Sequence, residues 1–317
     1  MTGKPAEPAG SEPTNMQIGV TMAALKTHTL DFNLVKEPMD SLLEACANKI
    51  EREWPPQLAS VGFGREFFLG TIRVCANTYF TVRYVCADKP KDPSRKLEYC
   101  LSMPPCLRTI LDSLFNVIFV LEDFPERLVW YQKAGWREEK QRLDQYLTTY
   151  GSLPEWQDWL KTYKNHVERG KELFGITKAE EANLKEIKYW PNPGKMPRYR
   201  NGKSVPTIRE FMVYANDWFY RDLSAESHMS ARGLMVRGGP LMKLTGPDHD
   251  YGPWLRQFKG IQLGMALVLS LGLISEIEVF FNFGLKPRVT YLWTILNEHI
   301  PFSKEIFKAR YEGLLPC

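Results

Sequence analysis

Apolar residues recur at intervals of three and four along most of the chain, which is the spacing of one face of an α-helix. Clusters of Pro and Gly separate these stretches, and no convincing pair of strand-like runs is found. The pattern predicts an all-α fold, a multi-helix bundle that is mainly antiparallel and has long loops. A strand is the alternative for one β-branched stretch, Phe63–Asp88, but its length without a turn signal favours a helix. The expected helices are Pro38–Trp54, Phe63–Asp88, Pro104–Phe124, Pro125–Tyr150, Leu153–Phe174, Thr177–Ile187, Thr207–Ser230, Pro253–Ile277, Arg288–Leu296 and Ser303–Tyr311.

The segment Thr207–Ser230 is sharply amphipathic and gathers the most chemically capable side chains. On a helical wheel its apolar side is made by Ile208, Phe211, Met212, Ala215, Phe219 and Leu223. The opposite side carries a narrow polar stripe made by Glu210, Asp217, Arg221, Ser224 and His228. Arg221 and His228 share a face and lie about 10 Å apart along the axis. An acid, an arginine, a hydroxyl and a histidine on one face indicate a candidate site.

The segment Pro104–Phe124 is apolar at nearly every position after Ile110, which is typical of a central helix. Arg108, Asp112 and Asn116 follow one another at steps of four and form its one polar stripe. A buried carboxylate without a partner costs several kcal/mol, so Asp112 should pair with Arg108 or with the Arg221/His228 stripe. A structural salt bridge to Arg108 is the favoured interpretation. The helices at 104–124 and 207–230 are expected to pack against each other.

A long loop, Tyr189–Pro206, precedes the amphipathic segment. Basic residues with interleaved aromatics suit a single-stranded nucleic acid, which needs phosphate contacts and base stacking. The alternative, which the pattern favours, is a solvated connector whose aromatics are packed. The candidate nucleic-acid-binding residues are Lys195, Arg198, Tyr199, Arg200 and Lys203.

The chain has 317 residues and a net charge of +4, which is too small to demand a nucleic-acid partner and does not exclude one. Residues 1–17, rich in Pro, Gly, Ala and Glu, are expected to form a flexible tail, followed by a single helical domain at 18–317. Its C-terminal helical extension is expected at 253–313. The longest apolar run, Ile261–Ile274, is too short to cross a bilayer and is expected to be a buried core helix without membrane contact.

Six cysteines lie at positions 46, 75, 86, 100, 106 and 317, without a CxxC pair or a zinc-like spacing. They are expected to be reduced thiols in a cytoplasmic protein. His166 is interpreted as a surface histidine, and His249 as part of a polar turn. The sequence therefore predicts neither a metal site nor a cofactor.

The element Tyr220-Arg221-Asp222-Leu223-Ser224-x3-His228 resembles the signature of a family of uncharacterised all-helical bacterial and phage-encoded proteins. That family also carries an earlier Arg-x3-Glu element, which Arg108-x3-Asp112 matches with a shorter acid. The resemblance covers about residues 106–230, and it implies a helical fold rather than a chemistry. It adds Tyr220, Asp217, Arg108 and Asp112 as supporting residues of the candidate site.

A looser resemblance is to HEPN-type ribonucleases, helical bundles with an Arg-x(4–6)-His motif that Arg221 and His228 satisfy. It implies metal-independent RNA cleavage in a homodimer cleft, in a defence or toxin-type enzyme. His228 would act as general acid or base, Arg221 as phosphate clamp and Ser224 as an orienting hydrogen-bond partner. The alternative is a non-catalytic helical binding module in which the same stripe is a buried, paired polar layer.

Overall fold

The structure of this chain is a computed structural model that describes residues 30–59, 61–86, 97–199, 205–227 and 252–315. The described part of the chain contains helices and no strand, so the predicted all-α fold is confirmed. The stretch that left a strand open is an α-helix over Gly64–Cys86, and residues 87–88 lie outside the described residues. The α-helices are α2 (Asn33–Arg52), α3 (Gly64–Cys86), α4 (Pro104–Leu121), α5 (Glu126–Tyr150), α6 (Gln157–Leu173), α7 (Lys178–Ala182), α8 (Pro206–Ala215), α9 (Arg221–Ser227), α11 (Gly252–Phe281), α12 (Lys286–His299) and α13 (Pro301–Arg310). Short helical turns are η1 (Pro56–Leu58), η2 (Leu97–Ser102), η3 (Pro154–Trp156), η4 (Leu184–Glu186), η5 (Met196–Arg198) and the π-helical turn η6 (Asn216–Tyr220).

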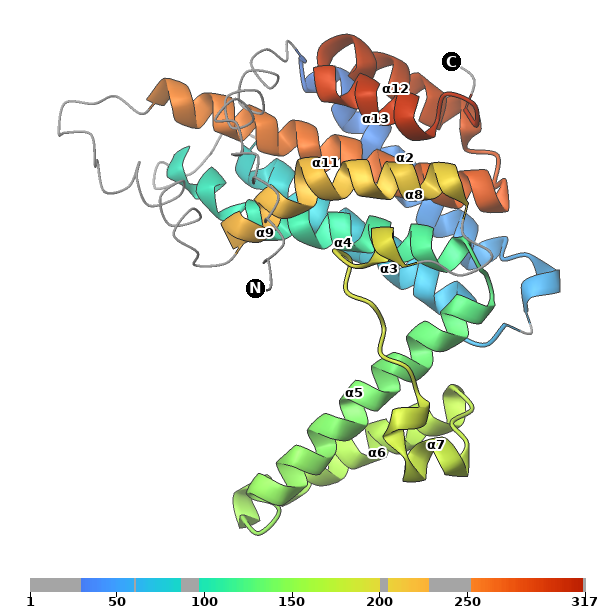
Figure 1. The fold of residues 1–317 in the computed structure, drawn as a ribbon. Coiled ribbons are helices and arrows are strands. Elements are labelled where there is room, and N and C mark those ends of the chain that lie inside the picture. The colour runs from blue at the N-terminus through green and yellow to red at the C-terminus, as the bar shows by residue number, and fades with distance from the viewer. Residues whose placement is uncertain (1–29, 60, 87–96, 200–204, 228–251, 316–317) are drawn as a thin grey trace, which may run out of the picture.

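Helix α11 runs through the middle of the bundle and packs against both α3 and α4 (Figure 1). Every residue from 261 to 278 is buried, as expected for a helix that is apolar on all sides. Gly272 permits a close approach, because a Cβ there would lie 3.3 Å from the Tyr311 hydroxyl. That hydroxyl donates a hydrogen bond to the Gly272 carbonyl over 3.1 Å. Helix α11 is thus the axis around which the other bundle helices pack.

The remaining bundle helices cover this axis from several sides. Helix α2 packs against α3, while α12 and α13 pack on each other at the end of the chain, and α12 also contacts α11. Helix α8 contacts α13, and α9 lies against α4. The predicted contact between the 104–124 and 207–230 segments is therefore confirmed.

Helices α5, α6 and α7 form an arm that stands out from the bundle (Figure 1). The arm has a small apolar core of its own, separate from the main core. Helices α5 and α6 approach closely at Gly170, where a Cβ would lie 3.2 Å from the Trp136 ring. The buried members of this core are Trp136, Leu143, Val167, Ile176 and Ile187.

Several predicted helix bounds differ from the structure. Helix α2 begins at Asn33 and contains Pro38, because the buried side chain of Val35 extends its apolar face upstream. The 207–230 segment is not one regular helix: the π-helical turn η6 separates α8 from α9. Residues 228–230 lie outside the described residues. A capping box at Thr177 and Glu180 begins α7, which ends at Ala182 and not at the predicted Ile187.

Helices α4 and α11 are both long and apolar enough to cross a membrane by length and composition. The 14-residue apolar run at Ile261–Ile274 is thus part of a 30-residue helix. Most of that helix is buried within the bundle, and α4 is buried over about half of its length. Buried core helices share this length and composition, so the two helices are weak evidence for a membrane location.

Candidate functional site

The polar stripe on α4 is occupied by intramolecular partners. Arg108 Nε donates to Asp112 Oδ1 over 2.7 Å, so the predicted pairing of Asp112 is confirmed. Asn116 Oδ1 accepts a hydrogen bond from Trp190 Nε1 over 2.8 Å. The side chains of Arg108 and Asp112 are 16% and 34% exposed, so the pair is half-buried rather than enclosed. The stripe therefore connects the loop that contains Trp190 to helix α4.

Tyr220 joins this stripe from the other polar segment. Its ring lies parallel to that of Phe115, with the ring centres 6.0 Å apart. The Arg108 guanidinium carbon lies 3.5 Å from the centre of the Tyr220 ring, which is the geometry of a cation–π contact. A Cβ at Gly194 would lie 3.0 Å from this ring, so the loop also packs closely on it. The Arg108-x3-Asp112 and Tyr220-x3-Ser224 elements are thus neighbours in space.

The charge state of Asp112 reflects its half-buried position. Burial raises the pKa of this carboxyl, and the hydrogen bond and charge of Arg108 lower it without reversing the effect. The net pKa of Asp112 is above its ordinary value. The folded protein therefore holds a proton on this group more tightly than the unfolded chain does.

The polar stripe on η6 and α9 is exposed at Asp217 and Arg221. The side chains of Arg221 and Asp217 are 71% and 52% exposed, and their nearest charged atoms are 3.9 Å apart. Ser224 is partly buried, while Phe219 and Leu223 bury the opposite side. His228 lies outside the described residues. The described members do not form a buried, paired polar layer, and they do not meet the Arg108/Asp112 pair through any described ion pair.

The basic loop separates into exposed cations and packed aromatics. Lys195 and Arg198 are exposed, whereas Arg200 and Lys203 lie outside the described residues. The Tyr199 ring packs against Phe119 and Trp130, with ring centres 5.3 and 5.4 Å apart. This ring is therefore used for packing instead of the base stacking considered from the sequence.

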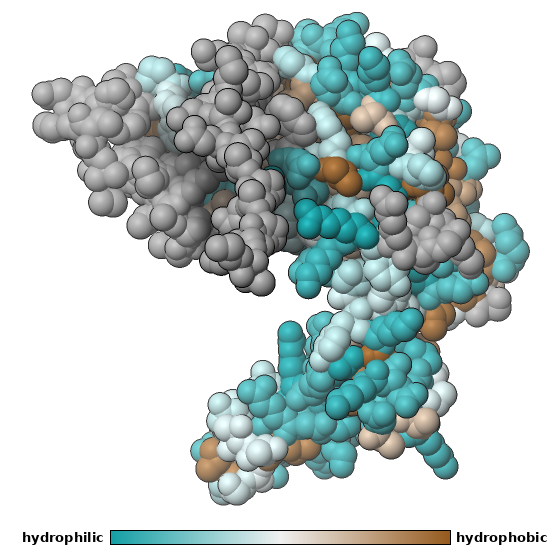
Figure 2. All heavy atoms as spheres, in the orientation of Figure 1, coloured by the Kyte–Doolittle hydropathy of each residue, from teal (hydrophilic) through white to brown (hydrophobic). Residues whose placement is uncertain are grey.

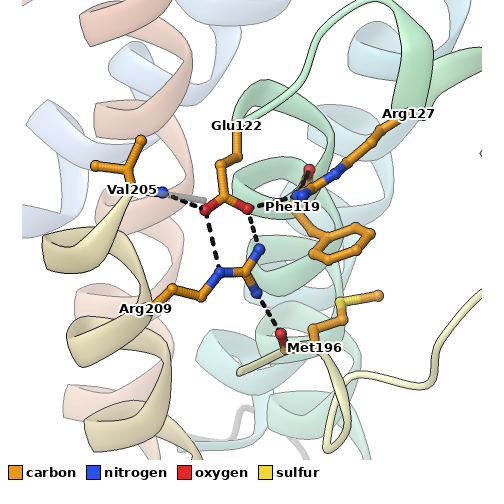
Figure 3. A network of polar contacts seen from close by, with 6 residues as sticks. All are labelled: Phe119, Glu122, Arg127, Met196, Val205 and Arg209. Atoms are coloured by element: carbon orange, nitrogen blue, oxygen red, sulfur yellow. Dashed lines mark hydrogen bonds and ion pairs between the residues drawn. The ribbon is translucent and has the colours of Figure 1, made fainter. Parts of the chain in front are cut away.

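A buried ionic cluster holds the start of the arm, the loop and α8 together (Figure 3). Glu122 Oε1 accepts hydrogen bonds from Val205 N (2.9 Å) and Arg209 Nε (3.1 Å). Its Oε2 accepts from Arg127 Nη1 and Arg209 Nη2. Arg127 Nη1 also donates to the Phe119 carbonyl, and Arg209 Nη1 donates to that of Met196. One carboxylate thus connects α5, α8 and the η5 loop.

The members of this cluster are withdrawn from water. The Glu122 side chain is 0% exposed, and those of Arg127 and Arg209 are 2% and 8% exposed. Arg127 Nε and Nη2 are buried and have no hydrogen-bond partner among the residues that the structure describes. The Phe119 ring instead lies 3.9 Å from the Arg127 guanidinium carbon, so its negative face partly offsets the desolvated charge. These three residues show no motif spacing in the sequence, because Arg209 lies 87 positions after Glu122, and the short Glu122–Arg127 interval matches no known element.

The outer half of the arm carries a ladder of aromatic rings that the sequence analysis also missed. Its rings belong to Tyr146, Tyr150, Trp156, Trp159, Tyr163 and His166, and we call this surface the aromatic face. Neighbouring ring centres lie 4.2 to 6.3 Å apart. The spacing of Trp156, Trp159 and Tyr163 by three and four residues was a usable signal, since it aligns them on one side of α6.

The aromatic face stays partly open to solvent. Trp159 is 44% exposed, and Leu147 and Leu153 at the free end of the arm are 41% and 37% exposed. Pale and brown surface gathers at this free end (Figure 2). The Tyr163 hydroxyl donates to Glu139, and burial together with this bond raises the pKa of Tyr163 to about 12. Tyr163 therefore keeps its proton at neutral pH and fixes the ladder to α5.

The described cysteines are free thiols, at positions 46, 75, 86, 100 and 106. Four of them are buried and Cys106 is partly exposed. Burial raises the pKa of the Cys75 thiol to about 12, which removes its thiolate at neutral pH. Among the residues that the structure describes, no group of three or more His, Cys, Asp or Glu side chains could hold a metal ion.

No family model matches this chain, and neither a curated protein nor a solved structure is significantly similar to it.

Proposed function

We propose that this chain is a helical interaction module that binds another protein through the aromatic face of its arm. The observation that carries the proposal is the exposure of Trp159, Leu147 and Leu153, next to partly exposed rings, on an arm that projects from the bundle. Exposed Trp and Tyr clusters supply much of the binding energy in protein interfaces, because their large rings lose little conformational entropy. Single exposed apolar residues are common, but a contiguous exposed set indicates an interaction surface.

The charges around the aromatic face favour a protein over a nucleic acid. Residues 138–169 contain six acids and five bases, so the outer arm has almost no net charge. A nucleic-acid site needs a cationic surface that neutralises phosphates. A mixed polar rim around an apolar centre is instead typical of protein interfaces. The acids are Glu138, Glu139, Asp144, Glu155, Asp158 and Glu168, and the bases are Lys140, Arg142, Lys161, Lys164 and Arg169.

A photo-crosslinking amino acid at position 159 tests this proposal in cells that produce the protein. The matched control carries the same group at Lys161, which is exposed two residues away on the opposite face of α6. We expect one discrete protein adduct from position 159 and none from position 161. Equal adduct patterns from both positions, or no adduct from either, would contradict the proposed role of the aromatic face.

A second candidate function is metal-independent RNA cleavage or phosphate binding by Arg221 and His228, assisted by Ser224. The supporting observation is the exposure of the Arg221 guanidinium, whose one ion pair within the described part of the chain is a long contact to Asp217. Exposed Lys195 and Arg198 add positive charge to the preceding loop. A catalytic stripe needs this access to solvent, whereas a structural polar layer does not.

The test of the second candidate is an RNA cleavage assay with purified protein. His228→Ala should abolish cleavage without lowering the melting temperature. Arg221→Lys should also fail, because a lysine cannot reproduce the two-point hold of a guanidinium on a phosphate. EDTA should leave the rate unchanged. Absence of cleavage by the wild type, or cleavage by either variant at the rate of the wild type, would rule out this function.

A further inference from the structure

We infer that the partner of the aromatic face is the same face of a second copy of this chain, packed in a two-fold antiparallel arrangement. This inference rests on the proposed interaction function and names its partner. In such a pair, two α5–α6 hairpins form a four-helix packing, and the open sides of the two ladders cover each other. The arrangement buries Trp159 of both copies at its centre.

Charges on the aromatic face are placed for this symmetry. Tyr146 and Trp159 lie at one level of the hairpin, since their ring centres are 5.3 Å apart. Glu155 precedes Trp159 by four residues, toward the free end of the arm. Arg142 precedes Tyr146 by four residues, toward the bundle. Arg142 is therefore about 6 Å from the level of the two rings by α-helical rise, and Glu155, in the turn η3, lies about 6–8 Å away in the opposite direction.

A two-fold axis at this level brings opposite charges together. Antiparallel packing places Glu155 of one copy opposite Arg142 of the second copy, and symmetry repeats the contact. Both groups are accessible for an ion pair between the two copies. The Arg142 side chain is 59% exposed, and its pairing with Glu139 is a 3.3 Å surface contact. Glu155 is exposed and makes no ion pair within the described part of the chain. A parallel packing would place each of these groups opposite its own copy, which like charges disfavour.

The near balance of charge on the outer arm also permits self-association. A strongly charged face repels its own copy, whereas six acids against five bases between residues 138 and 169 leave little net repulsion. A nearly neutral surface does not favour a different protein of either net charge as its partner. A second copy satisfies both the apolar centre and the Glu155/Arg142 pairs.

Sedimentation equilibrium of the full chain over a wide concentration range measures the association. We expect a reversible dimer for the wild type. Trp159→Ala should weaken dimerisation by at least about tenfold, as removal of a central aromatic does at an interface. The matched control is Tyr291→Ala on α12, where an aromatic that is 54% exposed lies away from the arm. This control should dimerise like the wild type.

A charge exchange separates a true contact from a loss of folding. Arg142→Glu and Glu155→Arg should each weaken the dimer, because each places like charges opposite one another. The double variant should restore it, which a damaged hairpin would not do. A monomeric wild type, or a double variant no better than either single one, would overturn the inference. If the chain is monomeric but position 159 still crosslinks to a different protein, the interaction function stands and only the self-pairing falls.

Discussion

Replacing Glu122 by Ala should destabilise the fold far more than replacing any exposed acid. Glu122 accepts hydrogen bonds from Arg127, Arg209 and the Val205 backbone, and its side chain is 0% exposed. Its removal leaves the Arg127 guanidinium buried without this counter-charge and takes from Arg209 the carboxylate that accepts two of its hydrogen bonds. The Val205 amide also loses its acceptor.

The magnitude follows from the burial of all three ionic side chains. Removing one partner of a buried pair costs about 3–5 kcal/mol, mainly because the remaining charge stays desolvated. Domains of this kind are stable by about 5–15 kcal/mol, so the variant should still fold in most of its population. The matched control is Glu51→Ala, because the Glu51–Arg73 pair spans 3.3 Å with side chains 49% and 57% exposed. An exposed pair of this type contributes at most about 1 kcal/mol.

Urea unfolding followed by circular dichroism measures both changes. We expect a clear shift of the midpoint for Glu122→Ala and almost none for Glu51→Ala, with similar slopes. A loss for Glu122→Ala no larger than the control would refute the reasoning. If Glu122→Ala fails to fold, a triple variant with apolar residues at 122, 127 and 209 tests the same point. It should be more stable than the single variant, since no charge remains buried.

Two further predictions concern single groups. The folded-state pKa of Asp112 is raised, so its contribution to stability should be present at low pH. This contribution should decline as the pH rises from the ordinary value of 3.8 through the raised value. The stability of the wild type relative to Asp112→Asn should therefore fall over this window. Unfolding at a series of pH values measures this difference, and a rising difference would contradict the direction of the shift. Among the described thiols, Cys106 alone is partly exposed and should be alkylated first in the native protein, as peptide mass spectrometry would detect. Equally fast labelling of Cys75 would contradict its burial.

Much of the fold was predictable because helical periodicity is a local property. Residue spacing predicted three features: the apolar helix at 104–124, its Arg108–Asp112 pair and its contact with the 207–230 segment. The start of α2 did not, because Pro38 was interpreted as a helix start although the apolar face continues upstream to Val35. The π-helical turn at 216–220 was not predicted, because a helical wheel assumes the same number of residues in every turn and a π-helical turn contains an extra residue.

The candidate site was less predictable because it depends on contacts between distant segments. Glu122 and Arg209 form an ion pair although they are 87 positions apart in the sequence, and no local pattern predicts such a pair. The sequence groups Tyr199 with the basic residues of its loop, but its ring packs on Phe119 of helix α4. The aromatic face was visible as spacing in α6 alone, but its continuation onto Tyr146 requires the hairpin.

The central position of α11 has a consequence for biosynthesis. The helix at the axis of the bundle spans residues 252–281, after α2, α3 and α4, which pack against it. During synthesis α3 and α4 emerge first and must wait for α11 with their apolar faces uncovered. Contacts this distant in sequence also form slowly, because a long loop must close before they can stabilise anything. The core of this chain should therefore form on the ribosome only after residue 281 has emerged, and the α3 and α4 surfaces are exposed to aggregation until then.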